Sequence, residues 1–161
     1  MYTPDRKEYY LRRGFDQAYA LSGSLFIDED CALGSNHLLI YGHHMKDGSM
    51  FGTLPAYADP AYAAQHSVIF FDTLRQEGRY EVVGAFYARV YKQDEEGGFR
   101  YYQYEDLTDP GRFDQYISQV KAASLYDTGV EPVYGDVLLT LSTCDYHTKD
   151  GRFVVVARKI A

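Results

Sequence analysis

The sequence predicts a mainly β domain: a mixed but mostly antiparallel β-barrel with one substantial helix and short peripheral helices. Its 17 Tyr and 9 Phe residues, without any Trp, suit half-buried strands in which one ring face packs and the hydroxyl meets water. Only residues 109–126 show the three- and four-residue apolar spacing of an amphipathic helix. Because one hydrophobic core typically serves about 100 to 200 residues, we expect a single domain over residues 1–161.

Short β-branched and aromatic runs, bounded by Gly, Asn and Asp, predict the strands. The runs are residues 24–28, 37–41, 67–73, 79–91, 99–104, 136–143 and 152–160. Turn residues separate the three central runs, so we expect antiparallel hairpins there. The last two strands are joined by a turn that is rich in Asp, His, Lys and Gly.

Capping residues and proline predict where helices begin. Residues 4–13 suit a short helix or turn, and residues 50–54 and 60–65 suit short helical turns because proline follows Asp59. The main helix begins near Asp109 and ends before the segment at 127–129. Its apolar face consists of Phe113, Tyr116, Ile117 and Val120.

The charge of the chain argues against one class of partner. A net charge of −7 disfavours nucleic acid, because duplex binding depends on Lys and Arg that neutralise phosphates. The sequence also lacks a stretch of the roughly 18 apolar residues that a bilayer span needs, and a signal peptide. The two cysteines have neither CxxC nor metal-ligand spacing, so we interpret them as separate free thiols.

Cys144 has the better setting for a reactive thiol. It closes an apolar strand, where a turn containing Asp145, His147 and Arg152 begins. Cys31 lies in an acidic turn that we expect at the surface, where neighbouring carboxylates would raise the pKa of the thiol. Composition alone nevertheless favours a packed structural cysteine at position 144, since free Cys is often a small buried hydrophobe.

The sequence also offers candidates for a general base and for a cation that could stabilise an oxyanion. His43 and His44 follow a strand through Gly42, and on physical grounds each is as well suited to a solvated loop as to catalysis. Arg152 comes eight positions after Cys144 across a turn, so its guanidinium could lie beside the sulfur, or could be an ordinary strand-edge charge. The order His, Cys, Arg hints at acyl transfer, whereas His37, His66 and His147 carry no such cue.

Two long motifs resemble class B sortases. They are residues 36–51 (NHLLIYGHHMKDGSMF), with the family's histidine segment, and residues 139–158 (LTLSTCDYHTKDGRFVVVAR), with its TLxTC strand, turn and arginine strand. Residues 9–28 and 126–130 are also similar to that family, so the resemblance covers nearly the whole chain. The helix between the penultimate pair of strands points to class B rather than class A. The resemblance therefore implies a sortase-type β-barrel.

The resemblance implies a role for each matching residue. The histidine after the motif glycine is catalytic in sortases, which selects His43 over His44. Cys144 would attack the Thr carbonyl of an LPxTG-like or NPxTN-like sorting signal, and Arg152, rather than Arg158 further along the strand, would stabilise the oxyanion. Tyr41 and Ser142 match positions that line the substrate groove in class B enzymes, and Asp145 matches an acidic position that can contact substrate. These three assignments rest on weaker matches than the catalytic ones. No cofactor or metal is implied.

The resemblance also implies partners and a location. They are a sorting-signal peptide of surface proteins, and an amine from a peptidoglycan cross-bridge or a pilin lysine. The expected site of action is the extracellular face of a Gram-positive cell membrane. Relative to the family, we expect the membrane anchor, N-terminal helix and first strand to be missing, so that an unpaired edge strand favours association of two copies. The alternatives are a non-catalytic peptide-binding domain on the same barrel and a hydrolytic cysteine peptidase.

Overall fold

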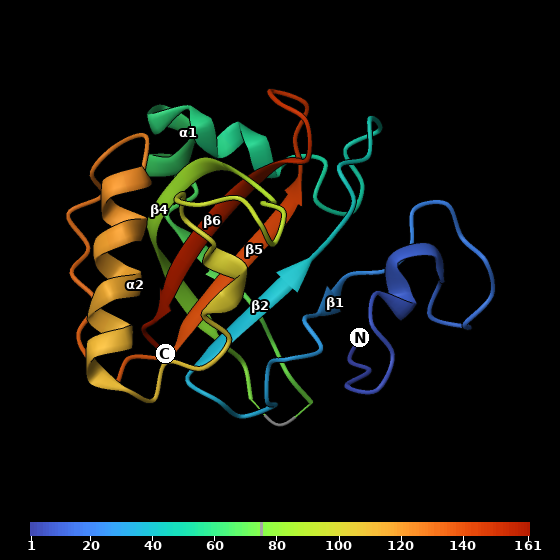
Figure 1. Ribbon diagram of the computed structural model, residues 1–161, viewed down its shortest axis with the longest axis horizontal. Helices are drawn as coiled ribbons and strands as arrows, with labels where there is room; N and C mark the ends of the chain where they lie inside the picture. The colour runs from blue at the N-terminus through green and yellow to red at the C-terminus, as the bar shows by residue number, and fades with distance from the viewer. Residues whose placement is uncertain (75) are drawn as a thin grey trace.

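Within residues 1–74 and 76–161, which the computed structural model describes, six strands form one curved sheet (Figure 1). In chain order the strands are β1 (Phe26–Ile27), β2 (His37–Tyr41), β3 (Val68–Phe70), β4 (Arg79–Arg89), β5 (Leu138–Cys144) and β6 (Gly151–Lys159). Their spatial order is β1-β2-β5-β6-β4-β3. Over these residues the outer strands β1 and β3 do not pair with each other, so the sheet forms a half-barrel. The predicted mainly β fold is confirmed.

One pair of strands differs from the rest. The strands β2 and β5 run parallel, whereas β1–β2, β5–β6, β6–β4 and β4–β3 are antiparallel. A parallel pair needs a long crossover, and here the chain between the two strands contains β3, β4 and the main helix. This crossover brings the carboxyl ends of β2 and β5 to the same edge of the sheet.

One long and several short helical segments cover the two faces of the sheet. The main helix α2 (Pro110–Ala123) begins at Asp109, whose carboxylate accepts a hydrogen bond from the Arg112 N–H at 2.8 Å. The helix α1 (Pro60–Gln65) is capped by Asp59 in the same way, and it packs beside the 3-10 turn η2 (Leu54–Ala58). Figure 1 shows α2 and α1 at different sides of the sheet. Among the described residues, every helix is too short or too polar to cross a bilayer.

The alternation of side chains along the strands divides the core into two layers. On the α2 side, Leu39 and Leu138 pack with Phe113 and Tyr116. On the other side, Ile40 and Leu139 pack with residues of η2 and α1. Because successive side chains of a strand point to opposite faces, the β5 residues after Leu138 that face α2 are Thr140, Ser142 and Cys144.

Two predictions about local structure are wrong. Residues 99–104 form no strand but contain the 3-10 turn η3 (Tyr101–Gln103), because their rings pack between Phe86 of β4 and Tyr116 of α2 instead of pairing at the sheet edge. Cys31 is also not at the surface: it is 1% exposed, and its Sγ accepts a hydrogen bond from the Leu39 N–H at 3.4 Å. The acidic residues around Cys31 suggested an exposed turn, but the Cys31 side chain is buried.

The N-terminal arm, residues 1–25, lies beside β1 (Figure 1). The Met1 ammonium donates to the Leu25 carbonyl at 3.0 Å, and the Ile27 N–H donates to the Met1 carbonyl at 2.8 Å. The arm also contains the 3-10 turn η1 (Tyr9–Arg12), which borders the site described below. Association of two copies through a sheet edge stays a prediction.

Candidate active site

The parallel register of β2 and β5 brings His43 and Cys144 together. Tyr41, the last residue of β2, is the register partner of Ser142, and His43 and Cys144 each follow this pair by two residues. Two hydrogen bonds hold the strand ends together: the Gly42 N–H donates to the Ser142 carbonyl at 3.1 Å, and the Thr143 hydroxyl donates to the Gly42 carbonyl at 2.7 Å. The two candidate catalytic groups therefore come from neighbouring strand ends.

The antiparallel pairing of β5 and β6 brings in Arg152. Cys144 and Arg152 are direct register partners, and such partners lie on the same face of a sheet with Cβ atoms about 4.5–5.5 Å apart. Arg158 instead pairs with Leu138 at the opposite end of β5, where its guanidinium binds Glu81 at 3.0 Å. Of the two arginines that the sequence offered, Arg152 is the one beside the thiol.

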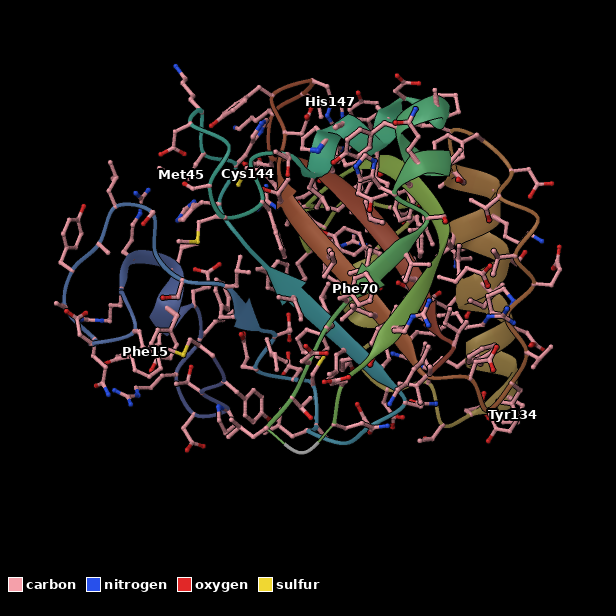
Figure 2. The ribbon with its side chains drawn as sticks, turned by 180° about the vertical axis from the view of Figure 1, so that it is seen from behind. Phe15, Met45, Phe70, Tyr134, Cys144 and His147 are labelled. Carbon is pink, nitrogen blue, oxygen red and sulfur yellow. The ribbon has the colours of Figure 1, made fainter. Side chains whose placement is uncertain are left out.

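One cavity of about 430 Å³ joins these three groups. His43, Cys144 and Arg152 line it together with Tyr41 and Ser142, two of the predicted substrate-groove residues. Cys144 is a free, partly exposed thiol. Figure 2 shows it at the edge of the molecule that also carries Met45 and His147. The cavity also extends to residues of the N-terminal arm, of the segment around β1 and of the chain between β4 and α2.

The imidazole of His43 is oriented by the N-terminal arm. Its Nε2 lies 2.6 Å from the Leu11 carbonyl oxygen in η1. Since a carbonyl can only accept, Nε2 must carry the hydrogen, and in the neutral ring Nδ1 is then the nitrogen with a free lone pair. His43 can therefore exchange a proton through Nδ1 while Nε2 stays bound to Leu11.

Two other predicted candidates lie apart from the cavity lining. His44 donates its Nδ1–H to the Cys144 carbonyl at 3.0 Å, so this hydrogen bond is to the backbone of Cys144 and not to its side chain. The Asp145 carboxylate accepts from the His147 N–H at 2.9 Å and from the His147 Nδ1 at 2.7 Å within its own turn. Neither His44 nor Asp145 is among the described residues that line the cavity, so a substrate contact by Asp145 stays a prediction.

The end of the cavity near β1 is acidic. Carboxylate oxygens of Asp28, Glu29 and Asp30 lie within 4.8 Å of one another. Two of the three have partners, because the Lys7 ammonium binds Glu29 at 2.9 Å and the Tyr41 hydroxyl donates to Asp28. Burial raises the pKa of both Asp28 and Tyr41. Asp28 and Glu29 are therefore already engaged by groups of the protein itself.

The sequence analysis missed two groups at the site. One is the Leu11 carbonyl, which carries no side-chain signal. The other is Tyr101, whose hydroxyl shares a 2.7 Å hydrogen bond with the Ser142 hydroxyl in the buried wall of the cavity. Burial raises the pKa of Tyr101 to about 12, although the hydrogen bond with Ser142 and the positive charge of Arg152 work in the opposite direction, so this phenol is neutral at physiological pH. An aromatic residue in an aromatic-rich segment gave no reason to select it.

Comparison with known proteins gives a consistent result. The family profile described as the sortase domain matches residues 5–160. Sortase B of Listeria monocytogenes is 29% identical over 157 residues, and sortase B of Staphylococcus aureus is 31% identical over 156 residues. These alignments cover 95% and 94% of the chain but 61% and 60% of the relatives, so the chain spans about three fifths of their length.

Solved structures show the same likeness. A Staphylococcus aureus sortase B–substrate complex superposes with a TM-score of 0.84 at 26% identity, over 99% of this chain and 72% of the other. A sortase B complexed with triglycine superposes with a TM-score of 0.85, also at 26% identity and with the same coverage. The half-barrel, its crossover and its helices are thus those of sortase B structures.

Proposed function

Because the chain belongs to the sortase family, and within it to class B, we propose that it is a cysteine transpeptidase with residues 1–161 as its catalytic domain. It cleaves an LPxTG-like or NPxTN-like sorting signal after Thr and transfers the Thr carbonyl to an amine. The observation that carries this proposal is that His43, Cys144 and Arg152 line one cavity.

In the first half of the reaction, the Cys144 thiol gives its proton to Nδ1 of His43, and the resulting thiolate attacks the Thr carbonyl carbon. A carbon–sulfur bond forms, and the carbonyl oxygen becomes an oxyanion, which the Arg152 guanidinium stabilises because it remains charged at any working pH. The carbon–nitrogen bond then breaks, and His43 protonates the leaving amine through Nδ1. The product is a thioacyl intermediate on Cys144.

In the second half, an incoming amine attacks the thioacyl carbonyl. Neutral His43 accepts the proton of the amine at Nδ1, and the carbon–sulfur bond breaks to release the Cys144 thiolate. The hydrogen bond from Nε2 to Leu11 keeps the ring in one orientation during both proton transfers. If water replaced the amine, the product would be a free acid.

The cavity supports an extended peptide as the substrate. Tyr41 and Ser142 line it beside Cys144, and a volume of about 430 Å³ is large enough for several side chains. A sortase B has been solved with substrate and another with triglycine, which supports a sorting-signal peptide and an amine-bearing peptide as the two reactants here. The amine would come from a peptidoglycan cross-bridge or a pilin lysine.

We assign the enzyme to the extracellular face of a Gram-positive cell membrane. The named relatives come from Listeria monocytogenes and Staphylococcus aureus, and the reactants proposed for this chain, surface proteins and peptidoglycan cross-bridges, lie on that side of the membrane. Attachment to the membrane would require an anchor other than the described helices.

The test is turnover of a library of fluorescent LPxTG-like and NPxTN-like peptides, with and without triglycine. The wild type should form the amide adduct in preference to the free acid. Cys144→Ala should reduce turnover by at least about 10³-fold, because it removes the nucleophile. Cys31→Ala is the matched control, since Cys31 is buried and burial raises the pKa of its thiol to about 12.

Three outcomes would contradict the proposal. Turnover that survives Cys144→Ala would eliminate the mechanism, and free acid as the main product in the presence of triglycine would indicate a hydrolytic peptidase. Binding of a peptide without any turnover would indicate a non-catalytic domain. Mass spectrometry of the wild type should also reveal the acyl group on Cys144.

A further inference from the structure

His44 holds the carbonyl of the residue that carries the thiol. Its Nδ1 lies 3.0 Å from the Cys144 carbonyl oxygen. Because that oxygen can only accept, Nδ1 carries a hydrogen, and neutral His44 is the opposite tautomer to neutral His43. The His44 ring also stacks on Tyr146, with centroids 6.0 Å apart and an interplanar angle of 26°.

This contact is the last in a series along the ends of β2 and β5. Gly42 binds the Ser142 carbonyl and the Thr143 hydroxyl, and His44 then binds the Cys144 carbonyl. On the opposite side, the Asp145 N–H donates to the Gly151 carbonyl at 3.0 Å. The backbone at Cys144 is therefore held from β6 on one side and from His44 on the other.

Such support matters because Cys144 is the final residue of β5 and precedes an exposed turn. Residues at the ends of strands open locally at low free-energy cost, and an error of about 1 Å in the position of a reacting atom can lower a rate by about 10²-fold. His44 is not among the described residues lining the cavity, so it affects the reaction only through the nucleophile.

We infer that His44 is a positioning residue: its Nδ1–H bond to the Cys144 carbonyl fixes the end of β5 so that the sulfur points between His43 and Arg152. The inference rests on the proposed role of Cys144 as the nucleophile. It assigns the two adjacent histidines of the motif different tasks, with proton transfer at His43 and backbone restraint at His44.

Three variants separate the hydrogen bond from the stacking and from the bulk of the ring. His44→Phe retains an aromatic ring against Tyr146 but has no donor, and His44→Ala loses both. His44→Asn loses the ring, yet its Nδ2 lies the same number of bonds from Cα as the imidazole Nδ1 and can donate to the same carbonyl. Melting temperatures show whether each variant is folded.

Turnover of the active peptide is the first measurement. His44→Phe and His44→Ala should lower kcat by about 10- to 100-fold while KM stays within about twofold, and His44→Asn should restore kcat to within about threefold of the wild type. Equal kcat values for the Phe and Asn variants, or a loss confined to KM, would overturn the inference while leaving the proposed function intact.

Hydrogen exchange of the Asp145 amide is the second measurement, and it requires no substrate. Protection should fall by at least about 10-fold in His44→Phe and His44→Ala and be retained in His44→Asn. If the wild type turns over no peptide, the proposed function fails, and this pattern still supports the restraint at Cys144. Equal protection of the Asp145 amide in the wild type and in all three His44 variants would overturn the inference.

Discussion

A buried histidine on the α2 side of the sheet makes the stability of the protein dependent on pH. His37 is 0% exposed, and its Nδ1 donates to the Tyr104 carbonyl at 2.6 Å. Its Nε2 accepts from the Thr140 hydroxyl at 2.8 Å, and that oxygen is 2.6 Å from the Tyr116 hydroxyl. These bonds use both nitrogens of the neutral ring, so a proton would add a buried positive charge.

The magnitude follows from the shift in pKa. Burial lowers the pKa of His37 from 6.5 to about 4, although the bond to the Tyr104 carbonyl opposes this. Between these values the unfolded chain binds a proton that the folded chain does not, so stability is complete above pH 6.5 and declines as the pH falls to about 4. At about 1.4 kcal/mol per pKa unit, the loss is about 3 kcal/mol.

The assay is urea unfolding at pH values from about 7.5 to about 4, on the wild type, His37→Gln and His66→Gln. His37→Gln should cost stability at neutral pH, because it disturbs a buried hydrogen-bonded network, but should remove most of the decline below pH 6.5. His66→Gln is the matched control, because it makes the same substitution at an exposed histidine instead of a buried one.

The difference between variants is the quantity to compare, because other groups titrate in the same range. Asp28 has a raised pKa, so it favours the folded state at low pH and loses that contribution as the pH rises through its folded pKa. This contribution is common to all three proteins, so it cancels when the free energies of unfolding of two variants are subtracted at each pH. Parallel curves for the wild type and His37→Gln between pH 6.5 and about 4 would refute the reasoning.

Two further predictions concern the site. Arg152→Ala should lower kcat/KM by about 10²- to 10³-fold. Arg158→Ala removes two partly exposed ion pairs, with Glu81 and Asp136, and should cost about 1 kcal/mol of stability while leaving kcat/KM unchanged. Equal kinetic losses in the two variants would mean that Arg152 has no special role. Gly42→Ala should destabilise the protein by about 1–3 kcal/mol and reduce turnover, because its Cβ would lie 2.4 Å from a Leu25 methyl carbon and 2.7 Å from the Phe51 ring. Thermal unfolding and peptide turnover measure both effects, and a Gly42→Ala variant as stable and active as the wild type would show that these side chains move aside freely.

The parts of the fold that depend on local pattern could be predicted from the sequence. The capped helix at Asp109 and the hairpin that joins β5 to β6 follow from spacing, and so does the approach of Arg152 to Cys144, because both residues flank one turn. The identification of His43 over His44 came from the family motif. The local sequence alone gave no reason to prefer His43 or His44 as the catalytic base.

Other features depend on contacts between distant segments. An aromatic run such as residues 99–104 suits either a strand or a packed turn, and only the rings of Phe86 and Tyr116 decide between them. Likewise, the acidic neighbours of Cys31 pointed to the surface, while the side chain itself packs beneath β2. The bond from His43 to Leu11 involves a backbone carbonyl, which every residue possesses, so no sequence signal could select it.

The parallel register of β2 and β5 is the structural fact on which the candidate site depends. Side chains alternate between the two faces of a sheet, so a slip of one residue would turn Tyr41 away from the face that carries Ser142. Leu39 and Leu138 oppose such a slip because both are buried on the α2 side, and a slip would move Leu39 to the other layer. The same hydrophobic alternation that builds the two core layers therefore also aligns the ends of β2 and β5, from which His43 and Cys144 enter the cavity.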